Sequence, residues 1–482
     1  MRVLAMSFQI YLTQRIGSEG IGLYELLMSV YGFAVSLAVS GVRLSTTRLT
    51  LEICANKKIN RGQVVRLCLT YSLLLGISAG GLLYLFSNPA ATLWLDTAEL
   101  ASALRVLAFG LPFLSLSSCL NGYFAARRQA GRMAVIQVSE FAVHTTLTFG
   151  ALFLFAPQTP VQACFLLVCT GLVSDLASAA FSAITYHLQR EPSGRIPIVL
   201  LPDLLHIAVP DAIGSWVRSG LVSAKHLLIP KGLKECGTSS AAALSTYGVI
   251  HGMVLPLLTF PAAFLGTISG LLVPEIAESH VHGNRKRVRA IMQRTLHLTL
   301  MFSLFAAMCM FCYGGELGKR FYRTAEAETY LRLLAPLIPL MYIDMVVDGM
   351  LKGLGLQTFS MQINILDAAL SLLLVWQLIP QMGIRGYLIT IYLSELLNFS
   401  LSLHQLRRHA ELHLPVYRSF FAPLLSALCA VLLPRLMWLS FCVNNPLAAM
   451  AYSTALYWVL LRLLGCITKR DIRWFFGIFR KN

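Results

Sequence analysis

The stretch from Gly17 to Glu52, GSEGIGLYELLMSVYGFAVSLAVSGVRLSTTRLTLE, decides the fold class of this chain. It opens with a glycine-rich turn, and the residues from 23 to 42 then contain one charged side chain, Glu25. Arg43 and Arg48 follow before the apolar run has ended. A bilayer helix carries arginine at depth only where it faces a polar interior. The stretch therefore indicates a membrane protein whose interior is partly polar.

The composition of the whole chain agrees with this interpretation. Of the 482 residues, 56% are hydrophobic and only 13% are charged, and the mean hydropathy is +0.68. Such values are typical of polytopic membrane proteins. The formal net charge of +17 lies mainly in short loops between long apolar runs, which favours a membrane surface over a nucleic acid. We therefore predict contact with membrane lipids and no nucleic-acid partner.

The sequence offers little sign of an enzyme or a metal site. It has no P-loop and no H-E-x-x-H, and its G-x-S-x-G at residues 76–80 lies inside an apolar run. The eleven cysteines lie mostly within apolar runs, and the single C-x-x-C at Cys309 and Cys312 is interpreted as helix packing. We predict a protein that is not an enzyme, with no metal site and no cofactor. Any transport would then be coupled to a Na⁺ or H⁺ gradient or to the membrane potential.

Apolar runs follow one another along the whole chain and predict an all-α polytopic membrane protein. The first, Val3–Ile16, rises only about 21 Å at about 1.5 Å per residue, less than the hydrocarbon core of about 30 Å. We interpret it as a truncated first helix of a 14-helix design, with residues before Met1 completing it. Thirteen full spans are predicted after it, at 22–54, 64–87, 100–125, 133–156, 161–187, 203–230, 241–273, 289–313, 329–351, 359–380, 386–406, 418–441 and 446–466.

The loops predict orientation and domain organisation. Most of the lysines and arginines of the loops fall on one side when the loop after the second span is placed inside, so the C-terminus is predicted to be cytoplasmic. The polar loop Gln189–Pro197 follows the sixth span and separates two halves, as in duplicated transporters. The predicted parts are an N-terminal lobe (1–188), a cytoplasmic linker (189–202), a second lobe (203–407), and two extra helices with a basic amphipathic tail (408–482).

The seventh span carries three charges at a spacing of seven: Asp211, Arg218 and Lys225. Seven residues make nearly two helical turns, so the three charges share one face over about 21 Å. That face has to meet a wet cavity or paired acids. One interpretation is a cationic wall for an anionic substrate. The other is a ladder of ion pairs that only holds the helices together.

Acidic residues lie within other spans and are candidates for cation binding or coupling. They are Glu140, one turn from His144, together with Asp175, Asp211, Asp344 and Asp348. A local explanation exists for some charges, because Arg48 and Glu52, and likewise Asp348 and Lys352, are four residues apart and can pair along one helix.

Several motifs resemble a known family. Residues 17–24 (GSEGIGLY), 29–33 (SVYGF), 247–279 and 348–357 (DGMLKGLGLQ) resemble the stage V sporulation protein B group of the multidrug/oligosaccharidyl-lipid/polysaccharide (MOP) exporter superfamily. The resemblance implies two six-helix lobes around a central cavity plus two C-terminal helices. It implies flipping of lipid-linked precursors, as in the lipid II flippases, and a role in spore cortex peptidoglycan. The run from Met1 to Leu4 is similar to the stretch that carries their first-helix arginine, which implies such a role for Arg2.

The expected function is a flippase of the bacterial cytoplasmic membrane that works by alternating access. Its cargo would be a polyprenyl-diphosphate-linked sugar, with candidate binding residues Arg2, Arg43, Arg48, Arg218 and Lys225. The first alternative is a cation-coupled multidrug or metabolite exporter, in which the acids matter more than the basic residues. The second is a non-transporting scaffold that binds cell-wall synthesis enzymes, in which the basic loops matter most.

Overall fold

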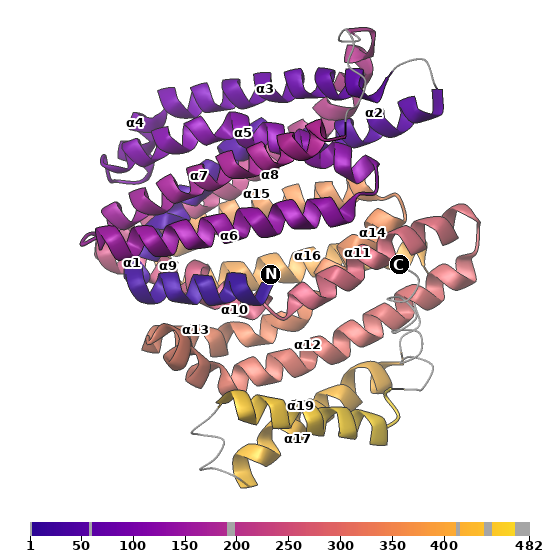
Figure 1. Cartoon of the computed structure of the whole chain (residues 1–482). Coiled ribbons are helices and arrows are strands. Elements are labelled where there is room, and N and C mark those ends of the chain that lie inside the picture. The colour runs from indigo at the N-terminus through magenta and orange to yellow at the C-terminus, as the bar shows by residue number, and fades with distance from the viewer. Residues whose placement is uncertain (1, 57–59, 190–197, 411–414, 438–445, 468–482) are drawn as a thin grey trace. The chain divides into compact units, whose positions relative to one another are not determined.

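A computed structural model describes residues 2–56, 60–189, 198–410, 415–437 and 446–467, and all regular structure in these ranges is helical. The all-α prediction is confirmed. Within these ranges, ten helices are long and apolar enough to cross a membrane. The chain forms two compact units, residues 16–248 and residues 2–15 with 249–482. We call them the first and the second unit and describe each by itself (Figure 1).

The first unit is a bundle of long helices. α1 (Arg2–Val39) is divided by Gly17, whose φ of 82° is not helical, and only its part after the division belongs to this unit. The other helices are α2 (Val42–Asn56), α3 (Arg61–Leu85), the short α4 (Ser87–Pro89), α5 (Leu100–Ala126), α6 (Ala130–Phe155), α7 (Pro160–His187), α8 (Leu201–Glu235) and α9 (Ser240–Gly248).

Small residues set the close packing around α5, which contacts α2, α3 and α7. A Cβ atom at Gly76 would lie 2.7 Å from Cα of Pro112, and one at Gly122 would lie 2.8 Å from the carbonyl oxygen of Arg43. Ser115, fully buried on α5, donates to the carbonyl of Ala38 at 2.9 Å or to that of Ser72 at 2.7 Å. Backbones that approach this closely are typical of membrane helices that pack through small residues.

α8 packs within the first unit, whereas the sequence placed it in the second lobe. Its Ser223 donates to the carbonyl of Ser29 at 2.6 Å, and its Trp216 indole donates to the carbonyl of Ser36 at 3.1 Å. These donors, together with close contact of the α8 backbone with Gly41, hold α8 against α1. In the sequence, the boundary between the two compact units therefore lies at residue 248, after the predicted linker 189–202. Residues 190–197 of that linker lie outside the described ranges.

The second unit begins with the first segment of α1, residues 2–15. The Gln9 side chain donates to the carbonyl of Gly252 at 3.2 Å, and that of Gln14 donates to the carbonyl of Phe321 at 2.6 Å. Its other elements are a π-helical turn (Val249–Val254), α10 (Leu255–Thr259), α11 (Ala262–Val281), α12 (Arg285–Tyr322), α13 (Ala325–Leu334), α14 (Ile338–Gly353), α15 (Gln357–Met382), α16 (Ile384–His409), a second π-helical turn (Tyr417–Phe421), α17 (Ala422–Met437) and α19 (Pro446–Leu463).

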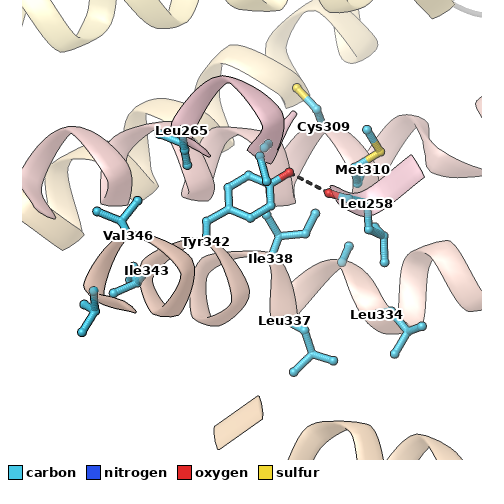
Figure 2. Close-up of a cluster of buried hydrophobic side chains, with 14 of the residues drawn as sticks. Leu258, Leu265, Cys309, Met310, Leu334, Leu337, Ile338, Tyr342, Ile343 and Val346 are labelled. Atoms are coloured by element: carbon cyan, nitrogen blue, oxygen red, sulfur yellow. Dashed lines mark hydrogen bonds between the residues drawn. The ribbon is translucent and has the colours of Figure 1, made fainter. Parts of the chain in front are cut away.

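The core of the second unit lies between α10, α11, α12 and α14. Figure 2 shows Tyr342 among Leu265, Ile338 and Val346, with its hydroxyl pointing to the carbonyl of Leu258. This 2.6 Å hydrogen bond satisfies a backbone acceptor near the break between α10 and α11, where membrane helices need such partners. The two predicted extra helices are α17 and α19, which pack on each other and on α12 (Figure 1). The predicted basic tail from residue 468 lies outside the described ranges.

Candidate functional site

The first unit contains an open cavity of about 680 Å³ between α1, α2, α5, α6 and α7. Its walls combine apolar side chains such as Met28, Val35 and Leu107 with many polar ones. The polar lining consists of Tyr31, Arg43, Ser117, Ser118, Asn121, Gln137, Glu140, His144, Ser174, Asp175 and Ser178. A space of this size with convergent polar groups is the usual form of a small-molecule site.

Arg43 is placed at one end of this cavity by the crossing of α2 and α5. Gly122 has no side chain, so α2 lies directly against it, and Thr47 donates to the Gly122 carbonyl at 3.0 Å. Asn121 precedes Gly122, so the Asn121 amide and the exposed Arg43 side chain lie at the same end. We call this end the basic end of the cavity.

Glu140 lies partway along the cavity and is held by α7, since its partner Ser178 also lies 3.5 Å from Ser117 on α5, four residues before Asn121. The Ser178 hydroxyl donates to Oε2 of Glu140 at 2.6 Å, and the Ser174 hydroxyl donates to its backbone carbonyl at 3.1 Å. One turn further along α6, His144 also lines the cavity. The hydroxyls of α7 therefore hold the carboxylate of Glu140 in a defined position.

Tyr31 and Asp175 converge at the other end of the cavity, beside Gly110. A Cβ atom at Gly110 would lie 3.4 Å from Oδ2 of Asp175 and 3.7 Å from the hydroxyl oxygen of Tyr31. Eleven residues of α5 separate Gly110 from Asn121, which corresponds to about 16 Å at about 1.5 Å per residue. We use the name acidic end for the stretch of the cavity from Glu140 to Asp175.

Two polar atoms of the lining are buried and lack a hydrogen-bond partner among the described residues. They are the hydroxyl of Tyr31 and Oδ1 of Asn121, one at each end of the cavity. Buried polar groups of this kind are normally satisfied by protein, water or ligand. Within the same ranges, Glu140 and Asp175 form no ion pair. The cavity is thus polar at both ends, with opposite charge.

Three of the candidate residues from the sequence are brought together in this cavity: Arg43, Glu140 and Asp175. The other basic candidates and the α8 stripe do not line it. Arg2, Arg48 and Arg218 are exposed, and Asp211 and Lys225 are half-buried on α8. Their roles stay predictions.

The remaining acidic candidates lie in the second unit, where each has a neutral polar neighbour. The Asn398 side chain donates to Asp344 at 3.1 Å, and Ser360 donates to Asp348. Asp348 also pairs with Lys352 at 2.6 Å, which is the local pair that the sequence allowed. The second oxygen of Asp344, Oδ1, is buried without a partner in the described part of the chain.

Sequence reasoning missed the uncharged members of the cavity: Tyr31, Asn121 and Gln137. Tyr31 and Gln137 look like ordinary residues of long helices. Asn121 carried a weak signal, because an amide within the otherwise apolar run of α5 needs a partner or a polar cavity.

A second cavity, of about 670 Å³, lies in the second unit and is mainly apolar. Its walls come from α12, α14, α16 and the turn before α17, and include Leu296, Ile343, Phe399 and Phe420. Arg407, exposed near the end of α16, is the one charged lining residue of this cavity in the described part of the chain. We call it the apolar cavity.

Comparisons with known proteins agree with this architecture. The family model described as "Polysaccharide biosynthesis protein" matches residues 1–216, and the MatE model matches residues 236–376. Stage V sporulation protein B of Bacillus subtilis (strain 168) is 22% identical over 491 residues, covering 98% of this chain and 94% of the relative.

Among solved structures, "Lipid II flippase MurJ, inward closed conformation" matches with a TM-score of 0.71 and 12% identity, covering 96% of both chains. An inward-facing multidrug resistance MATE family transporter matches with a TM-score of 0.64 and 15% identity, covering 85% of this chain and 95% of that one.

The fold is therefore that of a multi-pass bacterial membrane transporter. The two family models match successive parts of the sequence, and the similarity to stage V sporulation protein B extends over nearly the whole chain. The fold is shared with a transporter of the MOP superfamily.

Proposed function

We propose that this chain is a flippase, not an enzyme, that moves a lipid-linked cell-wall or polysaccharide precursor across the cytoplasmic membrane by alternating access. The main support for this proposal is the cavity of the first unit, which has Arg43 at its basic end and hydroxyl, amide and carboxylate groups along its length. The guanidinium of Arg43 is suited to the diphosphate, because arginine binds phosphate oxygens through paired hydrogen bonds. The names of the polysaccharide biosynthesis family and of the lipid II flippase support this cargo class.

The diphosphate would meet further charges along its path. Arg2, Arg48, Arg218 and Lys225 are the other basic residues that the sequence assigned to substrate binding. None of them lines the cavity, so we propose that they act on the diphosphate only during its movement and not in its bound state. The polyprenyl tail would occupy apolar surface near α17 and α19, and the apolar cavity in the second unit has the lining that a hydrocarbon chain requires.

We propose that the C-terminus lies in the cytoplasm, because the positive-inside pattern of the loops predicts this orientation. We propose coupling to a Na⁺ or H⁺ gradient or to the membrane potential, with no other cofactor. We also propose a role in spore cortex peptidoglycan, beside cell-wall synthesis enzymes, which the similarity to stage V sporulation protein B supports.

A second candidate function is a cation-coupled exporter of a multidrug or metabolite cargo. The observation that favours it is Asp344, which has one oxygen bound by Asn398 and the other buried without a partner in the described ranges. A monovalent cation or a proton would satisfy such an oxygen. This function predicts that Asp344→Asn abolishes transport of any cargo, whereas Arg43→Ala has little effect.

The test is a flipping assay with the purified full chain in proteoliposomes that contain a fluorescent polyprenyl-diphosphate sugar. We expect the chain to expose the sugar to a membrane-impermeant quencher at a rate that protein-free vesicles lack. Arg43→Ala should reduce this rate by about tenfold or more, and Arg43→Lys should retain part of it, because charge remains while the planar fork is lost.

Arg132→Ala is the matched control, because Arg132 is exposed on α6 away from the cavity. A wild-type rate equal to that of empty vesicles would refute the flippase. Full activity of Arg43→Ala would refute the role of the basic end. The scaffold would be favoured if the gene failed to complement cells that lack the protein only when basic loop residues are changed, whether flipping is intact or absent.

A further inference from the structure

The opposite charges at the two ends of the cavity in the first unit restrict what can fill it. Arg43 lies at one end, and Asp175 lies beside Gly110 about 16 Å away along α5 (1.5 Å per residue), with Glu140 between them. A cargo whose diphosphate is bound by Arg43 therefore extends its saccharide toward two carboxyl groups.

The Glu140 carboxylate is held in the space that the saccharide would occupy, and Asp175 borders the same space. Glu140 is held by Ser178 at 2.6 Å through its side chain and by Ser174 at 3.1 Å through its backbone. Oδ2 of Asp175 lies close to Gly110, because a Cβ atom added to Gly110 would be 3.4 Å from it. Ion pairs that would neutralise either group do not occur among the described residues.

The same end offers the groups that bind sugar hydroxyls. The carboxylate oxygens accept hydrogen bonds, and the Tyr31 hydroxyl, buried and without a partner in the described part of the chain, can both donate and accept. A neutral or amino-bearing sugar would satisfy these groups. A carboxylate on the sugar would instead lie against the carboxyl groups of Glu140 and Asp175, and like-charge juxtaposition costs several kcal/mol.

We infer that the acidic end of this cavity selects a saccharide head group without a carboxylate and rejects uronic-acid-type sugars. This inference rests on the proposed function, because it assumes that the diphosphate of the cargo is bound at Arg43. Asp175 and Glu140 are then specificity residues for the head group.

The experiment compares two short-chain analogues that differ only at C6 of the sugar. Citronellyl-diphosphate glucose and citronellyl-diphosphate glucuronic acid are titrated into the purified full chain in detergent, and their affinities are measured by calorimetry. We expect the glucuronic acid compound to bind at least about tenfold more weakly, which corresponds to about 1.4 kcal/mol. Glu140→Gln combined with Asp175→Asn should reduce this ratio to less than about threefold. Both replacements keep the side-chain shape, and the melting temperature of the variant verifies folding.

Glu99→Gln is the matched control, because Glu99 is exposed just before α5, and it should leave the ratio unchanged. Equal affinities of the wild type, no binding of either compound, or an unchanged ratio in the double variant would overturn the inference. The inference would also be overturned if the double variant kept the ratio of the two affinities while its flipping rate no longer depended on sodium. That result would assign the two acids to coupling.

The flipping assay separates this inference from the proposed function. Equal flipping of lipid-linked glucose and lipid-linked glucuronic acid would refute the selectivity and leave the flippase standing. Flipping of neither lipid would refute both.

Discussion

Replacing Gly122 by alanine should both destabilise the first unit and weaken binding at the basic end. The new Cβ atom would lie 2.8 Å from the carbonyl oxygen of Arg43 and 3.0 Å from Cβ of Thr46. Ordinary contact begins at 3.4 Å, so α2 has to move away from α5 by about 0.6 Å. The 3.0 Å hydrogen bond from Thr47 to the Gly122 carbonyl would lengthen in the same movement.

The expected magnitude follows from these two effects. Overpacking of this kind costs about 1–3 kcal/mol, and a weakened hydrogen bond adds about 0.5–1.5 kcal/mol. We therefore expect Gly122→Ala to lose about 2–4 kcal/mol of stability. The displaced Arg43 guanidinium should lower the affinity for citronellyl-diphosphate glucose by about tenfold, because one tenfold step corresponds to about 1.4 kcal/mol.

The assay is thermal unfolding of the purified protein in detergent, combined with titration of the same analogue. Gly150→Ala is the matched control, since no atom lies within 4 Å of the Cβ position of this helical glycine in α6. That control should stabilise the helix by about 0.5–1 kcal/mol. Equal melting temperatures and equal affinities for the two variants would refute the role of the α2–α5 crossing.

Three further predictions concern other contacts. Ser178→Ala removes the hydroxyl that holds the Glu140 carboxylate at 2.6 Å and should cost about 1.5–3 kcal/mol of stability, the worth of a hydrogen bond to a charged group, as measured by thermal unfolding against Ser182→Ala. Tyr342→Phe leaves the Leu258 carbonyl of the second unit without its 2.6 Å hydrogen bond and should cost about 1–3 kcal/mol; an unchanged melting temperature would contradict this. In right-side-out vesicles of a variant lacking other reactive thiols, the exposed Cys236 should react with an impermeant maleimide, whereas His282→Cys should react only after the membrane is opened. The reverse pattern would invert the predicted topology.

The helices were predictable from the sequence because the bilayer imposes a length and an apolar composition on each one. The predicted span 133–156 corresponds to α6 (Ala130–Phe155), and 359–380 corresponds to α15 (Gln357–Met382). The partners of a helix were not predictable in this way. α8 is joined to its unit by contacts such as that of Ser223 with Ser29, nearly two hundred residues apart in sequence, and hydropathy contains no information about such pairs.

The candidate site was predictable only where a charge interrupts an apolar run. Arg43, Glu140 and Asp175 were conspicuous for that reason, and all three line the cavity of the first unit. Tyr31 and Asn121 were not, because an uncharged polar residue in a helix can face lipid, a neighbour or a cavity. Which of these it faces depends on the rotation of each helix, and that rotation is set by contacts such as the one at Gly122.

The charged stripe on α8 and the cavity of the first unit are connected through the break between α1 and α2. Gly41, with a φ of 77°, lies at this break, and a Cβ atom there would come within 2.4 Å of the Ala208 carbonyl on α8. Arg43 follows only two residues later, so the position of α8 influences the basic end without any direct contact with cargo.

Loss of flipping in Arg218→Ala would therefore not by itself identify a binding residue. Affinity separates the two roles. If Arg218 contacts the diphosphate, Arg218→Ala should weaken binding of citronellyl-diphosphate glucose about as much as Arg43→Ala does. If it only positions α8, the affinity should fall by less than about threefold while the flipping rate still drops. We expect the second result, because Arg218 is exposed and does not line the cavity, and a loss equal to that of Arg43→Ala would refute this expectation.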